Sequence, residues 1–122
     1  MTTRQFAFLV NAPTDRAAAT MNALDHAVSL ADAGHEVRVY LDGAGTAWPG
    51  YTAENPGEPV SVHYEAAADR GLVVGACGLC AVEFDTANEL EREGVPVLGD
   101  GSAHSIDTPA LAEEGFELVF VS

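Results

Sequence analysis

The fold is decided by residues 5–45, which read QFAFLVNAPTDRAAATMNALDHAVSLADAGHEVRVYLDGAG. The apolar run at its start, Gln5–Val10, is typical of a strand that is buried on both faces of a parallel sheet. Apolar residues then recur at spacings of three and four up to Gly34, which predicts an amphipathic helix with Thr14 as its N-cap. Residues 35–41 alternate between apolar and polar side chains and predict a second strand. The stretch therefore predicts a strand–helix–strand unit with a right-handed crossover.

The rest of the chain continues this alternation. We expect one α/β domain over residues 1–122, with a five-stranded, mainly parallel sheet in a three-layer α/β/α, flavodoxin-like architecture. Residues 42–59 are rich in Gly, Pro and polar side chains. They are expected to form a lid, a binding loop or a disordered segment, or else a solvated connector anchored by an aromatic residue, Trp48 or Tyr51. The other predicted elements are helices over 62–70, 81–93 and 107–114 and strands over 72–76, 95–98 and 117–121.

The composition is strongly acidic, with 19 Asp and Glu residues, five Arg, no Lys and a formal net charge of −14. Such a surface repels phosphate backbones and anionic membranes, so neither nucleic acid nor a membrane is expected as a partner. It also fits a halophilic protein, because concentrated salt screens repulsion between like charges; an ordinary acidic protein is the alternative. The apolar runs fall well short of the roughly 20 residues of a membrane span. With no signal-peptide pattern at the N-terminus, this predicts a cytoplasmic protein.

Loops that follow the predicted strands should meet at one edge of the sheet, because the strands are expected to run parallel. Ligands of open α/β sheets bind at this edge, outside the carboxyl ends of the strands. Asn11, Asp42 and Gly78 are expected to line a pocket there. The only two cysteines of the chain, Cys77 and Cys80, follow the third predicted strand, and residues 100–104 follow the fourth. The spacing therefore predicts a rim where polar groups and thiols converge.

The sequence CGLC at residues 77–80 places a thiol between the end of a strand and the first turn of a helix. Unpaired backbone N–H groups and the helix dipole favour the thiolate at such a position. Gly78 is expected to let the backbone turn tightly and to leave the sulfur uncrowded. The negative charge of the chain opposes ionisation of the thiol, so the sequence leaves its reactivity open.

Two other interpretations of the cysteine pair are weaker. The thiols could simply pack in the core, as free cysteines often do. A structural zinc site needs four ligands, and a single CxxC supplies two. Neither His63 nor His104 has the paired spacing of zinc-binding histidines, so we predict no metal unless ligands are shared between subunits.

Cofactor and hydrolase motifs are not found. The DGAG sequence at 42–45 lacks GxGxxG, and GKS or GKT does not occur, so no nucleotide cofactor is predicted. Ser102 and His104 are close in sequence, but no GxSxG elbow is present. A serine hydrolase is therefore not expected.

Residues 11–45, with GHEVRVYLDG at their end, and RGLVVGACGLC at 70–80 resemble the DsrE/DsrF/TusD family of sulfur-relay proteins. The resemblance covers the first 45 residues and 70–82, and elsewhere only the order of elements agrees. It implies a small α/β/α fold, a homo-oligomer such as a trimer or hexamer, and a cysteine that carries sulfur as a persulfide. Cys77 matches that cysteine by its position after the strand, whereas Cys80 departs from the pattern. Fold resemblance alone does not establish an activity.

Three functions follow as hypotheses. The first is a sulfur carrier or sulfurtransferase in which Cys77 accepts persulfide sulfur from a donor protein and passes it to an acceptor, with Cys80 resolving, assisting or not taking part. The second is a dithiol redox protein, because CxxC beside a strand–helix–strand unit also matches a thioredoxin-like motif. The third is a non-enzymatic oligomeric binding protein, with a metal between subunits as one form of linkage.

Overall fold

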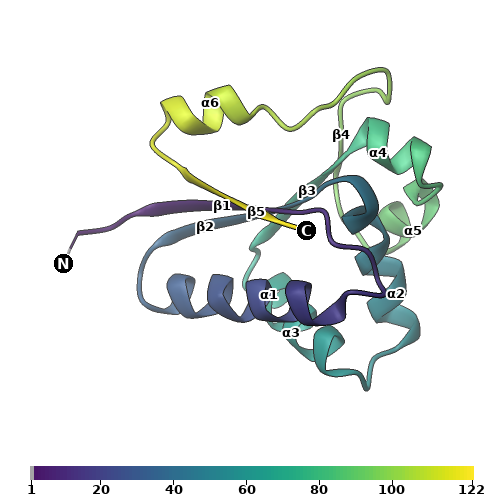
Figure 1. Ribbon diagram of the computed structural model, residues 1–122, viewed down its shortest axis with the longest axis horizontal. Coiled ribbons are helices and arrows are strands. Elements are labelled where there is room, and N and C mark those ends of the chain that lie inside the picture. The colour runs from purple at the N-terminus through teal and green to yellow at the C-terminus, as the bar shows by residue number, and fades with distance from the viewer. Residues whose placement is uncertain (1) are drawn as a thin grey trace.

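A sheet of five parallel strands in the order β4-β3-β2-β1-β5 forms the centre of the computed structural model, which describes residues 2–122 (Figure 1). This confirms the prediction of a five-stranded sheet in a three-layer α/β/α fold, and every strand pairing is parallel. The strands begin and end close to the predicted positions, because their apolar periodicity is strong. They are β1 (Gln5–Val10), β2 (Glu36–Leu41), β3 (Val73–Cys77), β4 (Val97–Leu98) and β5 (Glu117–Val121).

Helices cover both faces of the sheet, but unequally. Figure 1 shows α1 and α3 on one side of the strands and α6 alone on the other. The larger core lies on the α1 side and includes Leu24, Leu41, Trp48 and Leu90, whereas the core under α6 is built from Ala7, Leu9, Leu111 and Phe116. The helices are α1 (Ala17–Asp32), the 3₁₀ helix η1 (Gly43–Ala47), α2 (Trp48–Glu54), α3 (Pro59–Asp69), α4 (Gly78–Glu83), α5 (Ala87–Arg92) and α6 (Thr108–Glu113).

The direction of the connections changes once, at β4. From β1 to β4 the chain moves across the sheet one strand at a time, and it then returns through α6 to place β5 beside β1. Because strand crossovers are right-handed, reversing the direction moves the connecting helix to the other face. The chain therefore leaves β3 toward one face and β4 toward the other. Open α/β sheets bind ligands at the carboxyl ends of their strands, in the gap between two neighbouring loops that leave the sheet toward opposite faces.

Residues 43–54 are helical, so the prediction of a loop over 42–59 is wrong for most of that range. Trp48 has no exposed surface, and its indole Nε1 donates a hydrogen bond to the carbonyl oxygen of Ala12 at 2.8 Å. It also packs edge-on against the ring of Tyr51. Pro49 lies in the first turn of α2, where proline costs no hydrogen bond. Burial of one aromatic residue thus outweighs a composition that is typical of loops.

The predicted helix over 81–93 is two helices, α4 and α5, and this prediction is also wrong. Asp85 has a positive φ of 53°, which ends α4. Thr86 then precedes α5, and its hydroxyl donates to Thr46 Oγ1 at 2.8 Å in the buried interior. The break therefore binds the start of α5 to η1, which carries the residues that follow β2.

Smaller differences concern the ends of elements. The expected N-cap Thr14 is wrong, because residues 13–16 form a turn closed by the Arg16 N–H and the Pro13 carbonyl at 2.9 Å, and α1 begins at Ala17. Asp107 does cap α6, with its carboxylate accepting from the Ala110 N–H at 3.1 Å. Within residues 2–122, no helix combines the length and apolarity that crossing a membrane requires.

Candidate thiol site at the carboxyl edge of the sheet

Four side chains meet where β3 and β4 diverge: Asp42, Cys77, Cys80 and His104. One ligand atom from each residue lies within 4.8 Å of all the others. They come from the end of β2, the end of β3, the first turn of α4 and the loop between β4 and α6. The predicted convergence of strand-following loops at one rim is thereby confirmed. The four side chains meet beside β3 because the chain leaves β3 toward one face of the sheet and β4 toward the other.

Cys77 is the last residue of β3 and the N-cap of α4. Its Sγ lies 3.6 Å from His104 Nδ1 and 3.9 Å from Ser105 Oγ. The same Ser105 hydroxyl accepts a hydrogen bond from the backbone N–H of Gly78 at 3.2 Å. The loop after β4 is therefore tied to both the sulfur and the first residue of the helix.

The pKa of Cys77 is lowered to about 7. Burial alone raises this pKa, because it removes water from the thiolate. Hydrogen bonds from the backbone N–H groups of Cys80 and Ser105, together with the side-chain contacts with Cys80 and His104, lower the pKa and more than offset burial. Near neutral pH a large share of Cys77 is therefore thiolate, as its position at the start of a helix predicts.

Cys80 has the opposite character. Its Sγ donates to Asp42 Oδ1 at 3.4 Å and lies 3.7 Å from His104 Nδ1. Its pKa is raised to about 12, and burial is the largest cause. The backbone N–H of Gly43 favours the thiolate, but Cys77 and Asp42 disfavour it, so the pKa stays high. Near neutral pH the pair thus combines a partly ionised sulfur with a protonated one.

The turn that carries Asp42 is built by close backbone contacts. Asp42 N–H donates to the Val10 carbonyl at 2.9 Å, and Asn11 Oδ1 accepts from the Ala44 N–H at 3.0 Å. A Cβ on Gly45 would stand 1.9 Å from the Val10 carbonyl oxygen, so no other residue fits there without displacing β1. Asn11, predicted to line the pocket, therefore lies at the expected rim and braces the turn that positions Asp42.

The sulfurs are covered, and the expectation of an uncrowded thiol is wrong. Cys77 has 0% and Cys80 has 5% of its surface exposed. A Cβ on Gly78 would stand 2.4 Å from the Leu98 carbonyl oxygen and 3.3 Å from the Gly101 N. Gly78 is thus required because the loop after β4 packs directly on it. His104, which belongs to the same loop, is exposed.

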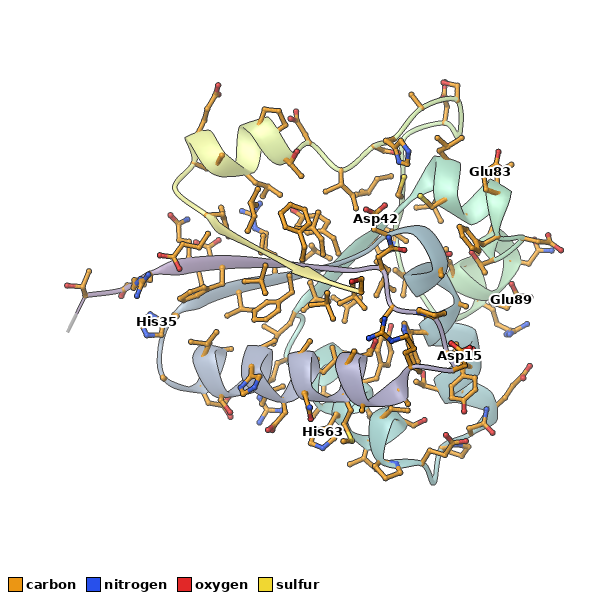
Figure 2. All side chains as sticks on the ribbon, viewed as in Figure 1. Asp15, His35, Asp42, His63, Glu83 and Glu89 are labelled. Carbon is orange, nitrogen blue, oxygen red and sulfur yellow. The ribbon has the colours of Figure 1, made fainter. Side chains whose placement is uncertain are left out.

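The other histidines and acidic residues lie elsewhere. Figure 2 shows Asp42 toward the end of the molecule that holds α4, with His35 at the opposite end and His63 on the face covered by α1 and α3. His63 Nδ1 lies 3.9 Å from a carboxylate oxygen of Asp25. The sequence pattern places His104 at the rim without linking it to the cysteines, and it gives no signal for Ser105. The prediction that a metal would require ligands from another subunit is also wrong, because one chain brings four donor atoms together.

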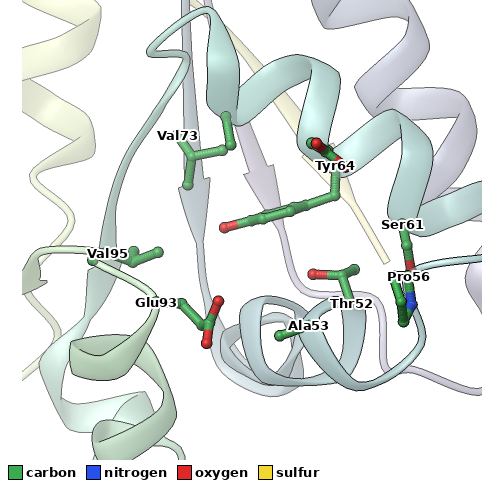
Figure 3. Close-up of a pocket in the computed structure, with 11 residues that line it drawn as sticks. Thr52, Ala53, Pro56, Ser61, Tyr64, Val73, Glu93 and Val95 are labelled. Carbon is green, nitrogen blue, oxygen red and sulfur yellow. The ribbon is translucent and has the colours of Figure 1, made fainter.

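A separate cavity of about 380 Å³ lies between α2, α3 and the segment after α5 (Figure 3). Tyr64 and Glu93 point into it, and burial together with the charge of Glu93 raises the pKa of Tyr64 above its ordinary value. The buried hydroxyl of Ser61 has no hydrogen-bond partner within residues 2–122. Neither cysteine lines this cavity, so it is distinct from the thiol site.

Comparison with known proteins found no relative of this chain. No family model matches the chain, and no curated protein or solved structure matches it significantly. The resemblance to the DsrE/DsrF/TusD family therefore stays a prediction, and the geometry of the thiol site is the basis for a function.

Proposed function

We propose that the protein is a sulfur carrier in which the Cys77 thiolate accepts the outer sulfur of a persulfide. The observation that carries this proposal is the placement of two unequal thiols within 4.8 Å of each other at the carboxyl edge of the sheet. Cys77 faces backbone N–H groups and His104, whereas Cys80 donates its proton to Asp42. The thiolate is the form of cysteine that attacks sulfur, whereas the protonated thiol of Cys80 does not react in this first step.

The loading step exchanges one sulfur–sulfur bond for another. The Cys77 thiolate attacks the outer sulfur of a donor persulfide, R–S–SH. A bond forms from Cys77 Sγ to that sulfur, the donor S–S bond breaks, and the donor leaves as the thiolate R–S⁻. Unloading reverses the exchange with an acceptor thiolate, so no external oxidant or reductant is consumed.

Cys80 offers a second fate for the loaded sulfur. Its sulfur can attack Cys77 Sγ, forming the Cys77–Cys80 disulfide and releasing the outer sulfur as HS⁻. The thiol proton leaves with the hydrosulfide or is taken up by solvent. His104, within 3.7 Å of both sulfurs, can stabilise negative charge on either of them when it donates from Nδ1.

Access to Cys77 requires the loop between β4 and α6 to move. The sulfur has no exposed surface, and His104 and Ser105 of this loop lie 3.6 Å and 3.9 Å from it. The contacts between this loop and the thiol site include the Gly78 N–H to Ser105 Oγ bond and the contacts of Ser105 and His104 with sulfur. A donor protein that displaces His104 would reach the thiolate directly.

Persulfide loading tests this function. The Cys80→Ser variant, freed of metal by a chelator, is incubated with glutathione persulfide, and the position of added sulfur is read by peptide mass spectrometry after alkylation. One added sulfur atom on Cys77 is expected, because the resolving thiol is gone. A Cys77→Ser chain that takes up sulfur equally well would end the proposal.

A dithiol redox function is the second candidate, since the two sulfurs lie within 4.8 Å of each other and both are reduced in this structure. In that case Cys77 attacks a substrate disulfide, and Cys80 then displaces the substrate thiolate and closes the Cys77–Cys80 disulfide. Catalysed reduction of insulin by the wild-type chain, without persulfide accumulation on the Cys80→Ser variant, would favour this function.

A further inference from the structure

We propose that Asp42, Cys77, Cys80 and His104 of a single chain form a four-coordinate site for a thiophilic divalent cation, with Zn²⁺ as the best match. This inference does not rest on sulfur transfer. It rests on the identity of the donors, on the distances between them and on the groups that surround them.

The donor set suits zinc. Two cysteine sulfurs, one imidazole nitrogen and one carboxylate oxygen are all common zinc ligands, and thiolates select against the hard cations Mg²⁺ and Ca²⁺. Both cysteines are free, so neither sulfur is lost to a disulfide. The four residues come from three separate segments of the chain, around residues 42, 77–80 and 104, which makes the convergence a property of the fold.

The distances fit a tetrahedron. Bonds of about 2.3 Å to sulfur and 2.0–2.2 Å to nitrogen or oxygen give tetrahedral edges of roughly 3.6 Å between a sulfur and either lighter atom. His104 Nδ1 lies 3.6 Å from Cys77 Sγ and 3.7 Å from Cys80 Sγ, and Asp42 Oδ1 lies 3.4 Å from Cys80 Sγ. Three edges therefore already have the length that an ion would impose. No ligand pair is separated by more than 4.8 Å, so the adjustment needed is small.

Surrounding groups hold the ligands in place. Backbone N–H groups face both sulfurs, from Cys80 and Ser105 toward Cys77 and from Gly43 toward Cys80. Asn11 fixes the turn after Asp42, and Ser105 fixes the loop beside His104 through Gly78. Hydrogen bonds of this kind orient ligands and tune their affinity for metal.

Zinc binding and sulfur loading would exclude each other, because both use the lone pairs of Cys77 Sγ. The ion would also draw His104 down over the sulfurs and keep the loop between β4 and α6 closed. Zinc would then act as a reversible block on the thiols, whatever reaction they perform. A chain loaded with persulfide should bind zinc poorly.

The test uses the reduced full-length chain, stripped of metal by a chelator that is then removed. Zinc chloride is titrated against a competing colorimetric chelator, and native mass spectrometry counts the ions. One Zn²⁺ per chain is expected. His104→Ala and Asp42→Asn should each weaken the affinity by more than about 10-fold, the lower end of what even outer residues of metal sites cost.

Matched controls replace the other paired histidine and aspartate. His63→Ala and Asp25→Asn remove a similar exposed pair that lies away from the thiols, and they should leave zinc affinity unchanged. Circular dichroism confirms that each variant is folded. If His104→Ala and Asp42→Asn bind zinc as tightly as the wild type, the ion uses the cysteines alone and the four-ligand site is refuted.

Cobalt provides a second measurement that needs no variant. Co²⁺ in a tetrahedral site with two thiolates gives strong ligand-field bands and sulfur-to-metal charge-transfer absorption. This spectrum is expected for the wild-type chain and should disappear when one equivalent of Zn²⁺ is added. The weak bands of an octahedral ion, or no bound metal, would overturn the inference even if sulfur loading on Cys77 succeeds.

Discussion

The thiol site has two halves that differ in how the fold holds them. The framework half consists of Asp42, Cys77 and Cys80, which stand at the ends of β2 and β3 and in the first turn of α4. The loop half consists of His104 and Ser105, which belong to the segment between β4 and α6. Both cysteines are buried, whereas His104 is exposed. Under the proposed function, the framework half would supply the reacting atoms, and the loop half would control their charge and access.

The largest effect should come from crowding the framework half. Gly45→Ala places a Cβ where the structure has the Val10 carbonyl oxygen at 1.9 Å, so β1 and the turn after β2 must separate. We expect a loss of about 4 kcal/mol in the free energy of unfolding, which is the upper range for one substitution. Urea denaturation measures it. Gly57→Ala is the control, because a Cβ there meets no atom within 4 Å, and an equal loss in both variants would contradict the account.

Trp48→Phe should have the next largest effect. It removes the side-chain donor to the buried Ala12 carbonyl and leaves a space where the larger indole ring stood. An unpaired buried acceptor and lost packing together should cost about 2–3 kcal/mol. Thermal denaturation followed by circular dichroism reads the loss. Unchanged stability would mean that residues 43–54 do not anchor the turn carrying Asp42.

Ser105→Ala removes the hydrogen bond that connects the loop half to the start of α4. The Gly78 N–H loses its acceptor, and a partly buried unpaired donor should cost about 1 kcal/mol. The loop should also open more often, so alkylation of Cys77 by iodoacetamide should become faster. Ser105→Thr retains a hydroxyl and serves as the matched variant. A slower reaction in Ser105→Ala than in the wild type would show that the loop does not limit access.

His104→Ala should change stability least, within about 0.5 kcal/mol, because the side chain is exposed. It should instead raise the pKa of Cys77, since the contact with His104 helps to lower it. The pH dependence of alkylation reports this shift. His63→Ala should leave the midpoint where it is, and a midpoint unmoved in His104→Ala as well would remove His104 from the site.

Much of the fold could be predicted because its signals are local. The apolar run of β1 and the alternation of β2 identify a buried strand and a half-buried one, and parallel strands then place their loops at one edge. The same reasoning correctly brought Asp42, Cys77 and Cys80 to one rim. Helix α2 and the break between α4 and α5 could not be predicted, because they depend on contacts distant in sequence, namely Trp48 with Ala12 and Thr86 with Thr46.

The contact of the loop half with the cysteines could not be predicted either, and the reason is related. His104 reaches the cysteines because the two-residue strand β4 pairs with the end of β3, aligning Leu98 with Cys77. Strand order is not encoded in the periodicity of either strand, so the sequence places His104 at the rim but beside no particular partner. The burial of Cys77 has the same origin, since the loop after β4 is what covers it.

The central claim is that the fold makes the two thiols unequal, and residue-resolved titration tests it most directly. Reduced, metal-free protein is alkylated briefly at a series of pH values, and peptide mass spectrometry follows each cysteine. Because the thiolate is the reactive form, labelling rises with pH through the pKa of each thiol. Cys77 should reach half its maximal rate at a pH of about 7, while Cys80 stays almost unlabelled until pH approaches 12. Parallel titration of both cysteines at the ordinary pKa of a free thiol would contradict the account.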